Sequence, residues 1–343
     1  MAKPRLGFDI GNHSVKIAST TKSGTAFYEI PLPDHMMQDG GIQLPNAFSD
    51  FLKKERKRLK IPKGDCALVL PPRQVICRTV TLPKMSTDQL MLNLPYEFSD
   101  FIQDDVDKFL CDYAMCDPEE GESPDQMTMM AATASKERIT SYIRMFAGAG
   151  LKLKVLLPPE MALINLVKQY RERNPGAPLE YCFVDVGQES VKITVIKKDR
   201  VQARRNINLG CSSIDRAIAE MMNVDAFLAG TYKLSNYQNV LESQECQDVC
   251  GNIAVEILKV LNFYQYNYRD SHLEGIYLTG GGAAVAPLRE AIQNVVDMPF
   301  LQTVRLIAGG VASGAGMAAA AHTEERRESI ASLGLLAAGV TCV

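Results

Sequence analysis

The chain has 343 residues, of which 46% are hydrophobic and 22% are charged, and its 37 basic and 40 acidic side chains leave a formal net charge of −3. This balance gives no electrostatic reason to bind nucleic acid or anionic lipid. No apolar run reaches the ~18–20 residues that a membrane span needs. The first residues lead into a strand-like segment without room for a signal peptide, so we expect a soluble, cytoplasmic protein.

Nine cysteines and four histidines are scattered along the chain. No pair of cysteines has the Cys-x-x-Cys spacing that is typical of zinc or redox sites. We therefore expect reduced thiols that serve packing rather than metal binding.

A ten-residue motif near the start of the chain occurs a second time. Residues 8–17 read FDIGNHSVKI and residues 184–193 read VDVGQESVKI, with six identical positions. Each copy has an apolar run that ends in Asp, a Gly turn and then alternating residues, which predicts a β-hairpin with an acid at its tip. Each copy continues into a further extended segment, at 25–31 and 200–209. Since a repeat reports architecture directly, we predict two similar lobes.

The sequence between the two copies predicts a helix and then a small α/β module. The helix covers 44–59, and we interpret its Lys/Arg-rich side as a solvated face, with a lipid- or partner-binding face as the alternative. The next elements expected are strands at 67–70 and 75–82, a helix at 86–101 with Ser86 or Thr87 as N-cap, strands at 109–115 and 127–134 around an acidic loop, and a helix at 136–149. Residues of about 80–153 are thus predicted to be inserted in the first lobe.

The rest of the chain predicts a boundary and the second lobe. Its expected elements are a strand at 152–157, a helix at 160–173, helices within 212–268, a strand at 275–278 and a helix at 285–295. The breaker Asn-Pro-Gly-Ala-Pro at 174–178 separates the lobes. The predicted organisation is therefore 1–79 first lobe, 80–153 insert, 154–178 connection, 179–328 second lobe with a helical subdomain at about 211–272, and 329–343 a closing apolar helix.

The two predicted hairpins have the chemistry of a phosphate site. A glycine turn presents backbone N–H groups to phosphate oxygens, whereas Asp9 and Asp185 need a divalent cation, such as hydrated Mg²⁺, between them and the phosphates. Lys16 can neutralise phosphate charge and Ser14 can donate its hydroxyl. A third element, the glycine triplet 280–282, lies between a strand and a helix, where a ring or phosphate can approach the backbone closely.

This order of hairpin, hairpin and glycine turn resembles the actin-like ATPase superfamily over nearly the whole chain. Within it, the sequence is most similar to the PilM family of type IV pilus assembly. The resemblance is carried by Leu94-Pro95-Tyr96-Glu97-Phe98, by Ala131-Ala132-Thr133-Ala134, by Glu256-Ile257-Leu258-Lys259 and by Ala331-Ser332-Leu333-Gly334-Leu335. It implies an α/β, actin-like (ribonuclease H-like) two-lobe duplicated fold with a small α/β domain inserted in the first lobe.

The resemblance also implies a function: a cytoplasmic ATP-binding scaffold that docks the N-terminal cytoplasmic tail of a PilN-like membrane protein and other pilus assembly components. The alternatives are a phosphotransferase of the sugar or acetate kinase type and an FtsA-like division protein. Membrane association is expected through partners only, self-association is left open, and ATP hydrolysis is expected to be slow at most.

Site residues follow from the motifs and the resemblance together. Asp9 and Asp185 are expected to hold Mg²⁺ through water, and Glu160 is the candidate for orienting the attacking water, with an ordinary acidic helix start as the alternative. Glu256 and Lys259 would contact ribose or adenine, or form only an exposed ion pair. The expected nucleotide-binding residues are Asp9, Gly11, Asn12, Ser14, Lys16, Asp185, Gly187, Gln188, Glu256, Lys259, Gly280, Gly281 and Gly282.

Overall fold

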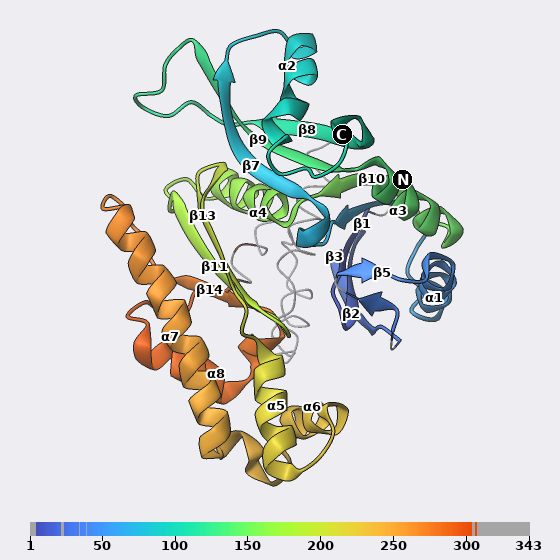
Figure 1. Cartoon of the computed structure of the whole chain (residues 1–343), viewed down its shortest axis with the longest axis vertical. Coiled ribbons are helices and arrows are strands. Elements are labelled where there is room, and N and C mark those ends of the chain that lie inside the picture. The colour runs from blue at the N-terminus through green and yellow to red at the C-terminus, as the bar shows by residue number, and fades with distance from the viewer. Residues whose placement is uncertain (1–4, 22–23, 34, 39, 304–305, 307–343) are drawn as a thin grey trace. The chain divides into compact units, whose positions relative to one another are not determined.

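The computed structural model describes residues 5–21, 24–33, 35–38, 40–303 and 306. These residues form two compact units, the first ending at Arg173 and the second beginning at Asn174 (Figure 1). The predicted closing helix at 329–343 lies outside the described residues. No helix in the described ranges is long and apolar enough to cross a bilayer.

Unit 1 is built on a five-stranded mixed sheet in the order β10-β6-β1-β2-β3. Strands β1, β6 and β10 run parallel, and β1, β2 and β3 form an antiparallel meander. The bounds are β1 (Arg5–Ile10), β2 (Ser14–Thr21), β3 (Gly24–Pro31), β6 (Asp65–Val69) and β10 (Lys152–Leu157), with β4 (Met37–Gln38), β5 (Gly41–Ile42) and η1 (Pro72–Gln74) in the connections.

Helices cover both faces of this sheet. Helices α1 (Pro45–Arg58) and α3 (Lys136–Gly148) share one core with it, where the rings of Phe8 and Phe146 meet edge to face at 5.0 Å. Helix α4 (Pro159–Arg173) packs on the opposite face of the sheet, where Ala162 contacts Ala67 and Val69 of β6. Apolar side chains at helical spacing hold these helices against the sheet.

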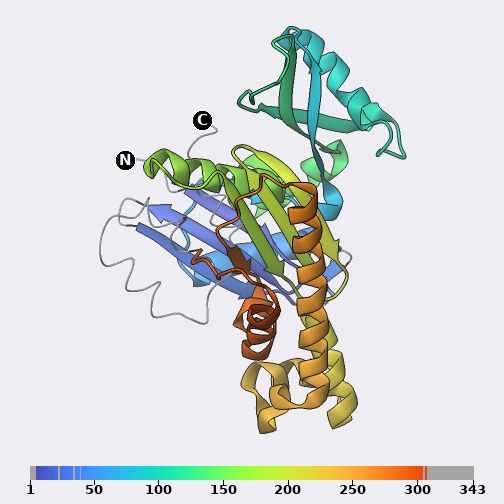
Figure 2. The same ribbon diagram turned by 90° about the vertical axis from the view of Figure 1, so that its left-hand side faces the viewer.

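A second sheet in unit 1 forms what we call the insert, residues 76–135. Its order is β7-β9-β8, and α2 and η2 cover one face with a core of their own (Figure 2). Ser86, one of the two predicted N-caps, caps α2 in a reciprocal capping box with Gln89. The bounds are β7 (Ile76–Pro83), α2 (Thr87–Asn93), η2 (Leu94–Phe98), η3 (Val106–Lys108), β8 (Phe109–Met115) and β9 (Gln126–Ser135).

The insert differs from its sequence prediction in two respects. The helix expected over 86–101 is α2 followed by the 3₁₀ turn η2, because Pro95 cannot donate to a continuing helix. The predicted module of 80–153 also contained α3 and β10, which the structure places on the five-stranded sheet. The separate sheet therefore ends with β9.

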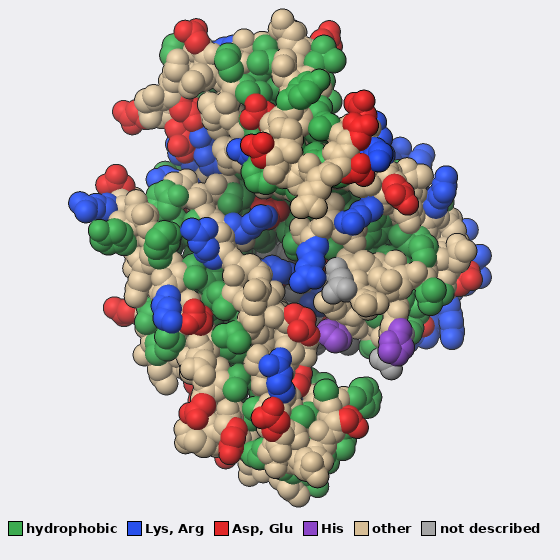
Figure 3. Space-filling view, viewed as in Figure 1, with side chains coloured by type: hydrophobic (Ala, Val, Ile, Leu, Met, Phe, Trp, Pro, Cys, Tyr) green, Lys and Arg blue, Asp and Glu red, His purple; other side chains and the backbone are tan. Residues whose placement is uncertain are grey.

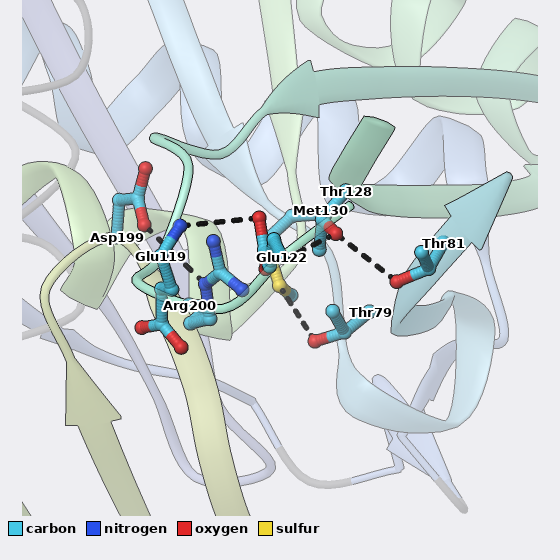
Figure 4. Close-up of polar contacts among 8 residues, drawn as sticks. All are labelled: Thr79, Thr81, Glu119, Glu122, Thr128, Met130, Asp199 and Arg200. Carbon is cyan, nitrogen blue, oxygen red and sulfur yellow. Dashed lines mark hydrogen bonds and ion pairs between the residues drawn. The ribbon is translucent and has the colours of Figure 1, made fainter. Parts of the chain in front are cut away.

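The acidic loop at 117–126 is tied to the insert's sheet (Figure 4). The hydroxyl of Thr128 donates to Glu122 Oε1 at 3.4 Å and lies 3.1 Å from the Thr81 hydroxyl. The other carboxylate oxygen of Glu122 accepts from the Glu119 N–H at 3.1 Å. These bonds hold a loop in which half of the residues are acidic in a defined conformation.

Unit 2 repeats the plan of unit 1 with a four-stranded sheet, β13-β12-β11-β14. Helix α7 runs along this sheet and continues to the helical end formed with α5 and α6 (Figures 1 and 2). The bounds are β11 (Glu180–Val186), β12 (Val191–Lys197), β13 (Arg200–Ile207), α5 (Cys211–Met222), α6 (Ala226–Ser235), η4 (Tyr237–Glu242), α7 (Gln244–Asn267), β14 (Ile276–Thr279), η5 (Gly281–Ala284) and α8 (Ala286–Val295).

The duplication predicted from the repeated motif is confirmed at the level of the sheets. β11, β12 and β13 form the same antiparallel meander as β1, β2 and β3. β14 pairs in parallel with β11, just as β6 pairs in parallel with β1. The eight cysteines within the described residues carry free thiols, as expected, and Cys342 lies outside those residues.

Candidate functional site

Both repeated motifs fold into hairpins with the same register. Asp9 faces Lys16 across the β1–β2 ladder, and Asp185 faces Lys192 across the β11–β12 ladder. In each turn the glycine N–H donates to the carbonyl of the serine three residues later, at 2.9 Å for both Gly11 and Gly187. The two turns are therefore equivalent in backbone as well as in sequence.

The first hairpin keeps its tip open to solvent. Gly11 and Asn12 are exposed, whereas Asp9, Ser14 and Lys16 are half-buried. The Ser14 hydroxyl donates to Glu29 on β3 at 2.6 Å. The serine that sequence reasoning assigned to phosphate thus holds the hairpin to its neighbouring strand.

Glu160 lies at the same edge of the unit 1 sheet as Asp9. Asp9 on β1 and Leu157 on β10 are both register partners of Val69 on the strand between them. Glu160 follows Leu157 by three residues, in the first turn of α4, and its side chain is only 5% exposed. The carboxyl ends of parallel strands and the start of the next helix are where α/β folds usually place ligands.

The glycine triplet packs directly on the second hairpin within unit 2. Asp185 pairs with Thr279, the last residue of β14, so Gly280 follows beside the carboxylate. Gly280 has φ +82°, and a Cβ there would overlap the Val186 carbonyl oxygen and a carboxylate oxygen of Asp185. Only glycine permits this approach. Gly281, in contrast, has open space around its Cα hydrogens.

The start of α5 closes the other side of the second hairpin. The N–H groups of Cys211 and Ser212 donate to the carbonyls of Gly187 and Gln188 at 3.1 and 2.7 Å. These bonds satisfy donors that a helix start otherwise leaves free. Burial raises the pKa of the Cys211 thiol, which keeps it neutral beside the turn.

A buried polar network connects this hairpin to α5 and α6, and sequence reasoning missed it. Lys233 Nζ lies 2.7 Å from Asp215 Oδ1, with both side chains 10% exposed or less. The Gln188 amide donates to Asp215 Oδ2 at 2.5 Å. The sequence contains one sign of this network, which is an acidic residue among apolar ones. Asp215 lies between Ile214 and Ile218 on the buried face of α5.

Glu256 and Lys259 form an exposed ion pair of 2.6 Å on α7. Both line a groove of about 500 Å³ between α5 and α7, together with Ser213, Arg216 and Glu220. The glycine triplet is not among the lining residues. Among the described residues there is no group of three or more His, Cys, Asp and Glu side chains placed to hold a metal ion.

Two duplicated sheets, each with an Asp–Gly hairpin and a parallel neighbouring strand, define the actin-like fold, and solved structures with that fold align along most of the chain. A PilM–PilN type IV pilus biogenesis complex aligns with TM-score 0.76 and 23% identity, covering 98% of both chains. The ethanolamine utilization protein EutJ from Carboxydothermus hydrogenoformans aligns at 0.53 with 13% identity, covering 88% of this chain and 84% of that one. MreB5 of Spiroplasma citri bound to ADP aligns at 0.50 with 13% identity, covering 94% and 99%.

The family model for the type IV pilus assembly protein PilM matches residues 7–308. The chain therefore belongs to the PilM family, as the sequence resemblance predicted. No curated protein sequence matches the chain.

Proposed function

We propose that the chain binds ATP through its two Asp–Gly hairpins and the glycine triplet, and acts as a nucleotide-dependent scaffold in type IV pilus assembly. The observation that carries the nucleotide part is the matched geometry of the hairpins, with Asp opposite Lys and the same glycine N–H bond in each. Turns of this kind present N–H groups to phosphate oxygens. A bound ADP in MreB5, which has the same fold, agrees with this use.

The donor set at the hairpins suits Mg²⁺. This ion usually keeps several waters and binds through one or two carboxylates and the phosphates of its nucleotide. Asp9 and Asp185 are half-buried carboxylates at equivalent strand ends, and Lys192 Nζ lies 4.0 Å from Asp185 Oδ2. When bound, the ion would neutralise phosphate charge, while Lys16 and Lys192 would balance the remaining charge.

We propose roles for the other predicted residues from their positions. The loop at Gly280, Gly281 and Gly282 would admit the nucleotide next to the second hairpin, and Glu256 and Lys259 would meet its ribose or base from the α5–α7 groove. Glu160, buried at the start of α4, would orient water for slow hydrolysis.

Ligand-induced stabilisation tests the nucleotide site. Unaltered protein should gain about 2.7 kcal/mol at ATP concentrations of about 100 times Kd. Asp9→Ala and Asp185→Ala should abolish this gain in the presence of Mg²⁺, whereas Glu172→Ala, an exposed acid at the far end of α4, should keep it. Undiminished ATP binding in both hairpin variants would refute the assignment.

We further propose that the chain docks the N-terminal cytoplasmic tail of a PilN-like membrane protein and reaches the inner face of the membrane through that partner. The solved complex that aligns over 98% of both chains is a PilM–PilN complex, which supports this partner class. The insert, with its own core and exposed apolar side chains, is the part of unit 1 proposed to contribute to docking.

The register of the insert indicates how to remove it cleanly. Cys77 and Ala132 are antiparallel partners on β7 and β9, so their Cα atoms lie about 5 Å apart. A variant with residues 78–131 replaced by Gly-Gly should retain ATP-induced stabilisation but lose binding of a fluorescent tail peptide in a polarisation assay. Retained peptide binding would exclude the insert from docking, and lost ATP stabilisation would indicate damage to unit 1.

A further inference from the structure

Helix α6 exposes its largest apolar side chains and buries a charged one. Phe227 is 81% exposed and Leu234 is 87% exposed, which are the highest values among the large hydrophobic side chains of the described residues. The side chains that α6 buries are those of Ala229 and Lys233. A surface helix usually turns its apolar residues inward and its charged residues outward. Both sides of α6 therefore depart from the usual pattern, and each departure needs a physical reason.

The inner side of α6 is explained by its contact with α5. Lys233 Nζ lies 2.7 Å from Asp215 Oδ1, so the buried ammonium group has a carboxylate partner. At the start of α6, the Asp225 side chain accepts from the Leu228 N–H at 2.8 Å and caps the helix. These contacts fix α6 in place. Its outer side is therefore a preorganised surface, which loses little conformational entropy when a partner binds.

The outer side of α6 carries a stripe that we call the α6 stripe, Phe227, Thr231 and Leu234. All three side chains are exposed, and their i, i+4, i+7 spacing places them on one helix face. Phe227 and Leu234 lie about 10 Å apart along the helix axis, and the smaller Thr231 leaves a depression between them. The Thr231 hydroxyl donates to the Phe227 carbonyl at 3.2 Å and so needs no partner outside the helix. Figure 3 shows hydrophobic side chains, in green, on the surface where Figure 1 labels α6. An apolar stripe exposed on a fixed helix is typical of an interaction site.

Acidic side chains dominate the helical end of unit 2 that carries this stripe. Residues 211–250 contain six acidic and two basic side chains, a formal charge of −4. Asp215 and Lys233 balance each other in the buried pair, which leaves Arg216 as the exposed cation of this segment. The exposed carboxylates are those of Glu220, Asp225, Glu242, Glu245 and Asp248. Within the described part of the chain, none of these five lies in an ion pair. The electrostatic field around the stripe is therefore negative and favours a basic partner.

We propose that the α6 stripe docks an amphipathic helix of another protein, with apolar residues along one side and Lys or Arg on both flanks. The apolar side of the partner helix packs between Phe227 and Leu234, and its basic flanks face the surrounding carboxylates. The partner is a helix rather than a strand, because the backbone N–H and C=O groups of α6 are bonded within α6 and offer no edge for strand addition. This surface lies in unit 2, so the proposal goes beyond the nucleotide site and the docking of the membrane protein's tail on unit 1.

The chain itself does not supply a segment of this chemistry. Residues 307–343, which lie outside the described residues, contain three acidic and two basic side chains and are therefore not basic. Helix α1 of a second copy is rich in Lys and Arg, but it buries Phe48 and Leu52 against its own sheet. It would bring charge to the α6 stripe without an apolar side. The chemistry therefore favours a helix from a different protein.

Fluorescence polarisation with the full chain and three labelled probe peptides tests this chemistry. The first probe is a peptide of about 18 residues, or five helical turns, with Leu along one side and Lys on both flanks. The second has the same composition in scrambled order, and the third has Glu in place of each Lys. At about 50 mM salt the first probe should bind at least about tenfold more tightly than either of the others. Its binding should weaken at about 500 mM salt, because the Debye length shortens.

Paired substitutions locate the binding surface. Phe227→Ser with Leu234→Ser should weaken binding of the first probe at least about tenfold, and both side chains are exposed enough for the fold to be kept. Leu92→Ser with Tyr96→Ser is the matched control, because it removes two exposed apolar side chains from the insert, where acids also outnumber bases. This control should leave binding unchanged. ATP-induced stabilisation and binding of the tail peptide, measured in parallel, should be unchanged by the α6 substitutions.

Removal of charge separates the two parts of the contact. Asp225→Asn keeps an N-cap of similar strength while it removes the carboxylate next to the stripe. Combined with Glu242→Gln, it should weaken the first probe severalfold at about 50 mM salt and much less at about 500 mM. Glu172→Gln with Glu290→Gln removes two exposed acids elsewhere and should have no effect.

Photo-crosslinking identifies the natural occupant. With Phe227→p-benzoylphenylalanine in the full chain inside its host cells, mass spectrometry should find the crosslink on a Lys- and Arg-rich amphipathic segment of a different protein. Leu234→Ser in the same chain should reduce this crosslink.

Four results would overturn the proposal. The first is equal binding of the three probe peptides. The second is binding that survives Phe227→Ser with Leu234→Ser but is lost in the insert control. The third is a crosslink confined to peptides of this chain, which would make the chain itself the occupant. The fourth is loss of tail-peptide binding in the α6 variant, which would assign the stripe to the docking of the tail.

Discussion

The buried Lys233–Asp215 pair offers a quantitative test of how the second hairpin is held. Lys233→Met removes the cation and leaves the Asp215 carboxylate, 10% exposed, with the Gln188 amide still donating to it. Breaking one partner of a buried pair typically costs about 3–5 kcal/mol. Replacing both, as in Asp215→Leu with Lys233→Met, removes the uncompensated charge, so we expect a net loss below about 2 kcal/mol. The coupling free energy between positions 215 and 233 should therefore be large.

Urea denaturation followed by circular dichroism measures these losses, and hydrogen exchange of α5 peptides assigns them to unit 2. Lys259→Met is the matched control, because it breaks the exposed pair with Glu256 and should cost no more than about 0.5 kcal/mol. Additive losses in the double variant, or a cost below about 1 kcal/mol for Lys233→Met, would show that the network does not hold the hairpin in place.

Three further results are expected. Gly280→Ala should lower stability by at least about 1–3 kcal/mol and weaken ATP-induced stabilisation, since Gly280 has φ +82° and a Cβ there would overlap the Val186 carbonyl oxygen. Gly281→Ala, with open space, should leave the stability of the free protein unchanged, and thermal unfolding with and without ATP compares the two variants. Burial raises the pKa of Cys66 and Cys182 to about 12 from 9.0, so stability present below about pH 9 should fall as pH rises from 9 towards 12, as urea midpoints at each pH would show. Ser86→Ala should cost about 1 kcal/mol and speed hydrogen exchange in α2.

The repeated motif was the most informative part of the sequence. It predicts two copies of one backbone even though the contacts between distant residues are unknown. Apolar spacing located α1, α3 and α4, and the turn residues located the hairpins. What local patterns could not reveal was partnership across the chain. Gln188 and Lys233 are far apart in sequence, and nothing near either residue indicates that Asp215 bonds to both.

The same limitation applies to two details. Nothing near Ser14 indicates that its hydroxyl donates to Glu29, which pairs with Lys16 and so lies diagonally across the β2–β3 ladder, and the role of Ser14 toward phosphate stays a prediction. The boundary of the insert was set too far along the chain, because α3 looks like any amphipathic helix. Only packing, with Phe146 against Phe8, assigns it to the five-stranded sheet.

The two units share a backbone plan but differ in the loop that follows the strand beside each hairpin. β6 and β14 occupy equivalent places, each parallel to the first strand of its hairpin. After β14 comes Gly280, which approaches the hairpin so closely that no Cβ fits. After β6 comes Leu70, whose N–H donates to the Leu157 carbonyl at 2.8 Å, followed by Pro71 and Pro72, which have no N–H. Duplication supplied two equivalent acids, and divergence of the following loop makes unit 2 the side that we expect to receive the nucleoside.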